Sequence, residues 1–258
     1  MGYTDQESAL IRAAELRAQA HHAQYDPSHD FYHVDRVRRL ALSIAHSHSR
    51  DDSLDVDVLV IELAALFHDL IDAKYLPKEG GPAPTARTTL APFWQRHDNA
   101  VDSPVVDEER RRLVERIVEN VSYSKEVKRI KAGEETEWHR ACRELHCVQD
   151  ADKLDAIGAF GIMRCAAYSA IANRPLFVPP SPPSLSPPPA SSSAPSPKAG
   201  PDALSHFDEK LFKLEGMMKT SRGRELARKR TEVMRGFVEE VRREWREGLG
   251  EGEMTREA

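Results

Sequence analysis

Apolar residues recur every three to four positions through most of the chain, which is the spacing of one face of an α-helix. Alternation between apolar and polar residues is nearly absent, so no segment favours a β-strand. The sequence therefore predicts an all-α fold. One expected helix begins near Asp30. The others cover residues 8–24, 56–70, 87–97, 108–121 and 138–171, the last interrupted or kinked near Gly158 and Gly161, and two more lie within 205–249.

Residues 175–201 differ from the rest of the chain, because they contain eleven prolines, seven serines and few apolar side chains. Such a segment cannot bury enough apolar surface to offset the entropy lost on ordering. We expect a disordered or partly polyproline insertion at about 175–203, within a single domain that spans 1–258. A recognition segment for a proline-binding module is the alternative. The remaining parts would be a core at about 28–172 and C-terminal helices at 205–249.

The bulk composition excludes several classes of protein. Apolar residues make up 40% and charged residues 31% of the 258 residues, as in a globular chain with a sizeable core. The net charge of −5 leaves no basic surplus for nucleic acid binding. No uninterrupted apolar run reaches the ~18 residues that cross a bilayer. We therefore expect neither nucleic acid nor a membrane as a partner.

The three cysteines are too few, and odd in number, for a disulfide framework. Residues 1–16 carry charges throughout and show no apolar segment of a secretory signal. These features predict a cytoplasmic protein, with the nucleus as a second compartment, rather than a secreted one. Assembly into a homo-oligomer is left open.

Two strong metal ligands, His68 and Asp69, stand side by side at the end of the apolar run 61–67. A buried imidazole needs partners for its nitrogens, and a buried carboxylate needs a cation. A divalent metal ion would satisfy both residues. The pair alone is weak evidence, because a His-Asp dipeptide occurs by chance in many proteins.

Further candidate ligands lie on other predicted helices. His33 stands on the apolar face of the helix that begins near Asp30, although a lone histidine there is more often a core residue. Asp152 lies in a run of small residues at 148–158, three positions before Asp155. Two carboxylates at that spacing repel one another unless a cation or a proton lies nearby. An exposed acidic stripe fits this segment poorly, because apolar residues surround both.

The order His33, His68-Asp69, Asp152 resembles the H…HD…D signature of the HD-domain metal-dependent phosphohydrolases. The flanking segments 28–37, 63–72 and 149–158 resemble the three motif helices of that family, and the similarity continues from His206 through Arg230. It covers about residues 28–240 apart from the Pro/Ser segment, and is nearest to the small stand-alone bacterial HD nucleotide pyrophosphohydrolases. The resemblance implies an HD-domain helical bundle in which His33, His68, Asp69 and Asp152 bind metal.

Two imidazoles and two carboxylates suit a six-coordinate ion better than a closed tetrahedral zinc site. We expect one divalent ion (Mn²⁺, Fe²⁺, Co²⁺ or Mg²⁺), which would polarise a phosphoryl group and acidify a bound water. The expected function is hydrolysis of a nucleotide or small phosphorylated metabolite, nucleoside triphosphate pyrophosphohydrolysis included. Phosphomonoester and cyclic nucleotide hydrolysis remain open. The alternative is a non-catalytic, metal-stabilised helical module that recruits a partner through the Pro/Ser segment.

The resemblance also suggests roles for residues beyond the ligands. Asp72, three positions after Asp69, is expected to orient the attacking water as the catalytic residue. Arg36, one helical turn after His33, could bind phosphate through two parallel hydrogen bonds. Lys74 follows the second motif and Lys210 matches a positive position of the family pattern, so both are further candidates for substrate binding.

A second group of metal-ligand types is His139, Cys142, His146 and Cys147. The pattern places all four on one continuous helix, where they cannot converge on one ion. We therefore expect no metal site there.

Overall fold

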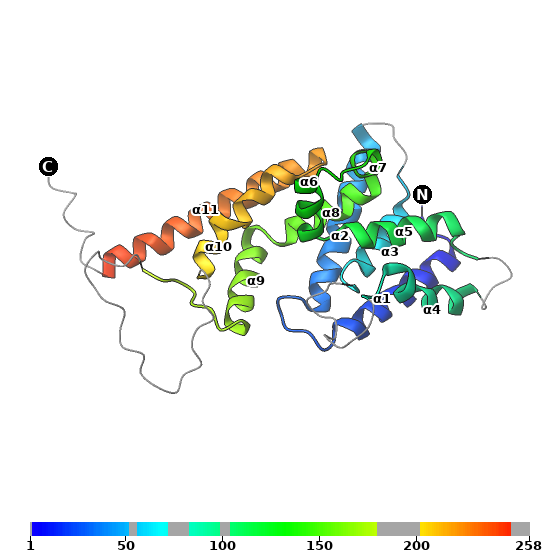
Figure 1. The fold of residues 1–258 in the computed structure, drawn as a ribbon, viewed down its shortest axis with the longest axis horizontal. Helices are drawn as coiled ribbons and strands as arrows, with labels where there is room; N and C mark the ends of the chain where they lie inside the picture. Colours follow the sequence, from blue (N-terminus) through cyan, green and yellow to red (C-terminus); the bar gives the residue numbers. More distant parts are fainter. Residues whose placement is uncertain (1, 52–55, 72–82, 99–103, 180–201, 249–258) are drawn as a thin grey trace. The chain divides into compact units, whose positions relative to one another are not determined.

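The computed structural model describes residues 2–51, 56–71, 83–98, 104–179 and 202–248. Within these ranges the chain is helical and contains no strand, so the prediction of an all-α fold is confirmed. The elements shown in Figure 1 are α1 (Asp5–His22), α2 (Phe31–Asp51), α3 (Val58–Phe67), α4 (Ala86–Asp98), α5 (Glu108–Asn120), α6 (Tyr123–Ala132), α7 (Glu137–Ala141), α8 (Arg143–Asp155), α9 (Gly158–Ile171), α10 (Ala203–Glu209), the 3₁₀ helix η1 (Leu211–Met217) and α11 (Ser221–Gly248).

The chain divides into two compact units. The first consists of Met1–Asp155 together with Met218–Leu226, and the second of Ala156–Met217 together with Ala227–Ala258. The assignment of the whole chain to one domain stays a prediction. Of the expected Pro/Ser insertion, 180–201 lie outside the described residues.

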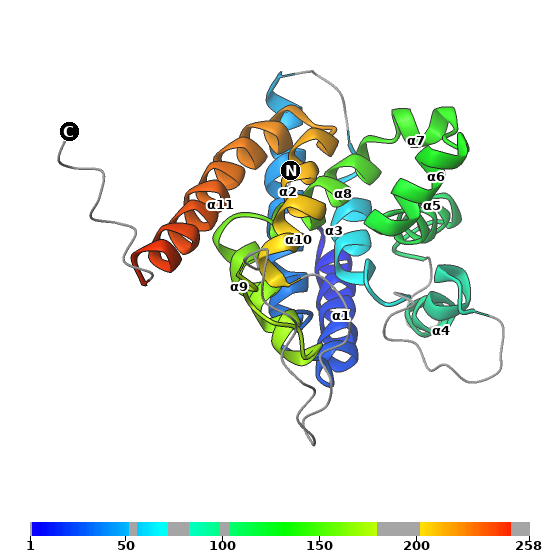
Figure 2. The ribbon, with the colours of Figure 1, turned by 60° about the vertical axis from the view of Figure 1, so that its left-hand side comes forward.

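Helix α3 forms the centre of the first unit. Its sequence is apolar on all sides, and every residue from Leu59 to Phe67 is buried. It packs against α1, α2, α5 and α8, and Figure 2 shows it between α2 and α5. The helix begins at Asp57, whose Oδ1 accepts the backbone N–H of Val60 over 3.1 Å. Burial of each large apolar side chain contributes about 1.5–3 kcal/mol, so α3 is a rigid support for the residues that follow it.

Helices α2 and α8 pack closely against one another. The buried face of α2 repeats at helical spacing, and α8 contributes buried residues of mixed size. Small side chains at this contact allow the two backbones to approach. The fully buried apolar residues of the two helices are Val34, Val37, Ala41, Ile44 and Ala45 on α2, and Leu145, Cys147, Val148, Ala151 and Leu154 on α8.

The first turn of α11 belongs to the first unit and is capped from a distance by Asp150 on α8. The Asp150 carboxylate, which is fully buried, accepts the backbone N–H groups of Lys219 (3.0 Å) and Thr220 (2.8 Å) and the Thr220 hydroxyl (2.7 Å). These donors have no partner within the helix. The carboxylate therefore anchors the start of α11 to α8.

The second unit contains α9, α10, η1 and the remainder of α11. Phe207 on α10 stacks on Phe237 of α11, with ring centroids 5.9 Å apart. Gly158 begins α9 with φ of 74°, a conformation that favours glycine. A β-carbon at this position would also stand 2.9 Å from the side chain of Arg230. The kink predicted near Gly158 is thus a complete break between two helices.

Two features of the helix pattern differ from the predictions. Residues 138–171 contain a second break that was not predicted, because Cys142 adopts an extended backbone with ψ of 105° and separates α7 from α8. Helix α6 was not predicted from the apolar pattern. Its buried residues are Glu126 and Arg129, whereas its Ile130 is exposed, so hydrophobic periodicity does not reveal it.

Cys142, Cys147 and Cys165 are all buried and free, in agreement with the expected absence of a disulfide framework. Within the described residues no single helix is both long and apolar enough to cross a membrane, although α8 and α9 pass that test as a bent pair.

Candidate metal centre

Helix α2 begins at a polar turn that fixes His33. The Asp30 carboxylate accepts the backbone N–H of His33 over 3.0 Å, as expected of a residue that caps a helix start. His33 is only 1% exposed, so its imidazole lies within the packed unit. The prediction that a helix begins near Asp30 and carries His33 inward is confirmed.

His68 stands at the C-terminal end of α3, where backbone carbonyls lose their helical partners. Its Nδ1–H donates to the Ala65 carbonyl over 2.8 Å. This hydrogen bond satisfies the helix end and fixes the ring orientation. It also leaves Nε2 as the nitrogen that faces the centre of the site.

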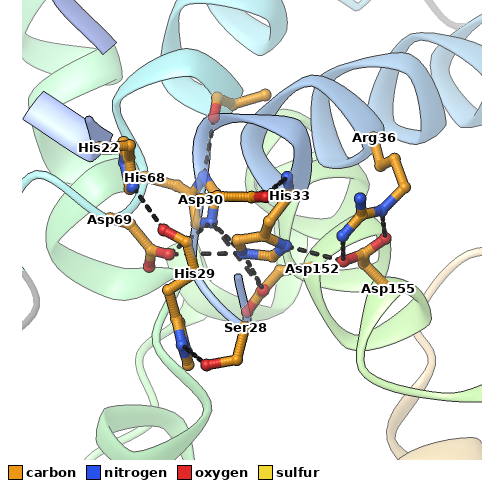
Figure 3. A network of polar contacts seen from close by, with 11 residues as sticks. His22, Ser28, His29, Asp30, His33, Arg36, His68, Asp69, Asp152 and Asp155 are labelled. Atoms are coloured by element: carbon orange, nitrogen blue, oxygen red, sulfur yellow. Dashed lines mark hydrogen bonds and ion pairs between the residues drawn. The ribbon is translucent and has the colours of Figure 1, made fainter. Parts of the chain in front are cut away.

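His33 is oriented by Asp155 on α8. The His33 Nδ1–H donates to Asp155 Oδ2 over 2.8 Å, and Asp155 is 1% exposed. Arg36 binds the same carboxylate through two hydrogen bonds, Nε to Oδ1 at 2.7 Å and Nη2 to Oδ2 at 3.0 Å. Figure 3 shows this group beside His33. An acceptor on Nδ1 is the usual arrangement of a metal-binding histidine, because it leaves Nε2 unprotonated.

The two Nε2 atoms meet at one point, together with two carboxylates (Figure 3). His33 Nε2 and His68 Nε2 lie 3.3 Å apart. Asp69 Oδ2 is 3.4 Å from His33 Nε2 and 3.3 Å from His68 Nε2, and Asp152 Oδ1 is 3.7 Å and 3.9 Å from the same atoms. Ligand atoms of His33, His68 and Asp152 all lie within 4.8 Å of one another.

These separations fit a bound divalent ion. Ligands at about 2.1 Å from an octahedral ion stand about 3 Å apart when adjacent and about 4 Å apart when opposite. The measured separations fall between those limits. The mixed nitrogen and oxygen donors match the expected class of ion, whose identity stays open.

The electrostatics of the cluster also favour a cation. Burial would lower the pKa of His68, but the Asp69 carboxylate and then Asp152 outweigh it and raise that pKa to about 9. Burial would raise the pKa of Asp69, but His68 and His33 hold it well below its usual range. Without a metal ion, the carboxylates therefore retain a proton on the His68 imidazole. A divalent ion would take that position.

The other predicted site residues have different surroundings. Arg36 is held by Asp155, and its binding of phosphate stays a prediction. Asp72 and Lys74 lie outside the described residues. Lys210 lies at the end of α10 in the second unit, and its role in substrate binding also stays a prediction.

The prediction of one continuous helix for His139, Cys142, His146 and Cys147 is wrong. His139 lies on α7, Cys142 lies at the break, and His146 and Cys147 lie on α8. The histidines make local hydrogen bonds instead. His139 Nε2 lies 3.0 Å from Asn120 Oδ1, and His146 Nε2 lies 2.8 Å from the His139 carbonyl. Among the described residues, the metal-binding geometry occurs only around His33, His68 and Asp152.

The sequence reasoning missed two contributors to the site. The first is Asp155, which the sequence analysis considered only as a charge that repels Asp152. Its position among apolar residues indicates that it is buried and needs a partner. His22 on α1 is the second contributor, and it is 3% exposed. Its Nδ1–H donates to the His29 carbonyl over 2.9 Å beside the cluster in Figure 3. The position of His22 beside the cluster is apparent only from the fold.

Comparison with known proteins supports the same assignment. The HD domain model matches residues 30–157. YpgQ of Bacillus subtilis (strain 168) is 30% identical over 237 residues, which cover 91% of this chain and 94% of YpgQ. The crystal structure of YpgQ in complex with ADP superposes with a TM-score of 0.62 at 24% identity, covering 93% of this chain and 96% of that chain.

The crystal structure of an HD-superfamily hydrolase from Bacillus thuringiensis superposes with a TM-score of 0.59 at 26% identity, covering 93% of this chain and 98% of that chain. The ordered histidines and aspartates, the helical fold and these similarities agree. The chain belongs to the HD-domain superfamily of metal-dependent phosphohydrolases.

Proposed function

We propose that this protein hydrolyses a phosphate bond of a nucleotide or another small phosphorylated metabolite, with one divalent ion bound by His33, His68, Asp69 and Asp152. The observation that carries the proposal is that the two Nε2 atoms lie 3.3 Å apart and that each carboxylate lies within 3.3–3.9 Å of both of them. Membership in a hydrolase superfamily does not favour the non-catalytic alternative.

The chain's own residues prepare the site for this reaction. The ion, when bound, would polarise a phosphoryl oxygen and lower the pKa of water from about 15.7 toward neutrality. Asp155 and the Ala65 carbonyl hold the two Nδ1–H groups, so both imidazoles present their lone pairs without rearrangement. Asp152 is 24% exposed at its side chain, whereas the two histidine side chains are 1% exposed. The Asp69 side chain is 15% exposed, so we expect substrate to approach the cluster from the side of the two carboxylates.

The nucleotide class is supported by the relative YpgQ, which has been crystallised with ADP. Nucleoside triphosphate pyrophosphohydrolysis is the finer reaction that we propose first. Release of pyrophosphate would distinguish it from release of inorganic phosphate, and neither product would appear if only a cyclic phosphodiester were opened.

The test is a panel of substrates with the purified protein and Mn²⁺. The panel contains nucleoside triphosphates, diphosphates and monophosphates, a cyclic nucleotide and a generic phosphodiester, and both phosphate products are quantified. We expect turnover of at least one nucleotide, abolished in His68→Ala and Asp69→Asn. The matched control is His46→Ala, which removes an exposed histidine from α2. No turnover across the panel, with metal bound, would support the non-catalytic alternative.

The remaining predicted residues can be tested in the same assay. Asp72→Asn should reduce kcat while leaving the metal content unchanged, because its expected role is to orient water. Lys74→Ala and Lys210→Ala should raise KM if these residues bind phosphate. Unchanged kinetics in any one of these variants would remove that residue from the mechanism.

A further inference from the structure

A cavity of about 710 Å³ lies between α1 and α4 in the first unit. This volume is within the range of about 300–1,000 Å³ that is typical of small-molecule sites. Leu70, which follows the predicted ligand Asp69 directly, is part of its wall. Along the sequence, the cavity wall therefore begins one residue after a predicted metal ligand.

The charged residues of the cavity wall are all basic. Arg17 on α1 and Arg96 on α4 both line it, and none of the described lining residues is acidic. Burial and then the neighbouring Arg96 lower the pKa of Arg17, so the two guanidinium groups repel one another. Two like charges on one wall without a carboxylate create a position where an anion is favoured.

Both arginines retain hydrogen-bond donors for a ligand. Arg17 Nη2 donates to the Thr89 carbonyl over 2.7 Å, which fixes the side chain, while its Nε is buried and has no hydrogen-bond partner. Arg96 is exposed, and no hydrogen bond or ion pair joins it to another residue of the described ranges. That Nε atom is buried, so a ligand in the cavity would contact the terminal nitrogens of the Arg17 guanidinium instead.

Apart from Thr89, His21 and His97, the rest of the described wall is apolar. Leu16, Leu70 and Phe93 line the cavity together with small residues, and Phe93 is 5% exposed. Such a surface suits the organic part of a ligand, while the arginines suit a phosphate group. The two kinds of surface share one cavity, so they select a molecule that has both parts.

His21 connects this cavity to the metal cluster electrostatically. Its imidazole lines the cavity, and burial and then Arg17 lower its pKa, while the Asp69 carboxylate partly opposes them. The cavity arginine and the cluster carboxylate therefore act on the same ring. Leu70 in the cavity wall directly follows Asp69, so chain connectivity also links the cavity to the cluster.

We propose that the α1–α4 cavity is a binding subsite for an organic phosphate, in which Arg17 and Arg96 bind a phosphate group that is not hydrolysed and Phe93 and Leu70 pack against the organic part. This inference rests on the proposed function, since the metal cluster supplies the adjoining position for the phosphate that is cleaved. It assigns substrate recognition to two arginines on α1 and α4.

The test is isothermal titration of the Mn²⁺-loaded protein with ADP and, separately, with adenosine, with chromatography to show that ADP stays intact. We expect Arg96→Ala to weaken ADP binding by about 10- to 100-fold, the effect of losing a charge-assisted hydrogen bond. Adenosine binding should not change. Arg17→Lys, which keeps the charge but loses the guanidinium donors, should also weaken ADP binding.

The matched control is Arg87→Ala, because Arg87 is a second exposed arginine on α4 that does not line the cavity. Its ADP affinity should equal that of the unmodified protein, and melting temperatures would show that all variants fold. Equal affinities for Arg96→Ala and Arg87→Ala, or no ADP binding by the unmodified protein, would overturn the subsite.

The two proposals can fail separately. Turnover that depends on His68, combined with ADP binding that ignores Arg96, would refute the subsite and leave the proposed hydrolysis intact. ADP binding that depends on Arg96, without turnover of any substrate in the panel, would support the subsite and refute the proposed hydrolysis.

Discussion

His33 on α2 donates its Nδ1–H to the carboxylate of Asp155 on α8 over 2.8 Å, across 122 residues of sequence. The same carboxylate holds Arg36, one helical turn after His33, through two further hydrogen bonds. Asp155 thus neutralises Arg36 and orients the imidazole that faces the metal cluster. Its carboxylate also makes the imidazole a better metal ligand.

Replacement of Asp155 should weaken metal binding without removing a ligand. In Asp155→Asn the negative charge behind His33 is lost, and we expect the affinity for Mn²⁺ to fall by about 10- to 100-fold. Metal content after dialysis against a buffered Mn²⁺ series measures the change. Asp35→Asn is the control, because Asp35 lies on the same helix as His33 and, among the described residues, its ion pair is with the exposed Arg39. Equal affinity in the two variants would contradict the role of Asp155.

Metal removal should lower the thermal stability of the protein. The cluster places two carboxylates beside two imidazoles, and a divalent ion that binds only the folded state adds stability of about 2.7 kcal/mol at 100 times its dissociation constant. Calorimetry in EDTA, followed by Mn²⁺ titration, should show a rising Tm. His68→Ala should lose this response and His46→Ala should keep it. A Tm in the unmodified protein that does not depend on Mn²⁺ would argue against a bound ion.

Glu126 should stabilise the fold in a pH-dependent manner. This carboxylate is 1% exposed and lies 2.7 Å from the ammonium groups of Lys153 and Lys219. Burial alone would raise its pKa, but Lys153 and then Lys219 lower it below the usual 4.5. Because the folded state holds the ionised form more tightly, this stabilisation is complete above pH ~4.5 and is lost as the pH falls through the lowered pKa.

Glu126→Gln should leave both lysines unpaired and cost about 3–5 kcal/mol at pH 7. Urea unfolding at pH 7 and at pH 4 measures the free energy of unfolding, and the difference between the variant and the unmodified protein should shrink at pH 4. Glu134→Gln, which changes an exposed glutamate, is the control. A loss for Glu126→Gln no larger than that of the control would refute the role of this ion cluster.

Two glycines of α11 should respond in opposite directions to alanine. A β-carbon on Gly223 would collide with the Asp150 carboxylate that caps the helix, whereas nothing lies within 4 Å of a β-carbon on Gly236. Gly223→Ala should therefore destabilise the protein by about 1–3 kcal/mol. Gly236→Ala should stabilise it by up to about 1 kcal/mol, because alanine favours the helix. Equal Tm shifts of the same sign would show that Asp150 and Gly223 do not form a close contact.

Local sequence patterns were sufficient for most of the fold, because amphipathic helices show their buried face in the spacing of apolar residues. Helix α2 is predicted correctly for this reason, with its start marked by Asp30, whereas α3 is predicted from its continuous apolar run. The same reasoning fails for α6, whose buried side chains are the charged Glu126 and Arg129. A charged residue is buried only where a partner exists, and that partner lies on another helix.

The sequence by itself determined the helical class, the family and the four residues that we expect to bind metal, because ligand chemistry and helical periodicity are local properties of the chain. Only the tertiary structure decided how those residues are supported. Arg36 was expected to meet phosphate, yet its guanidinium holds Asp155, 119 residues away. The partner of a buried charge depends on which helices pack together. That packing brings residues that are distant in the sequence into contact, and the local sequence around each residue does not indicate its partner.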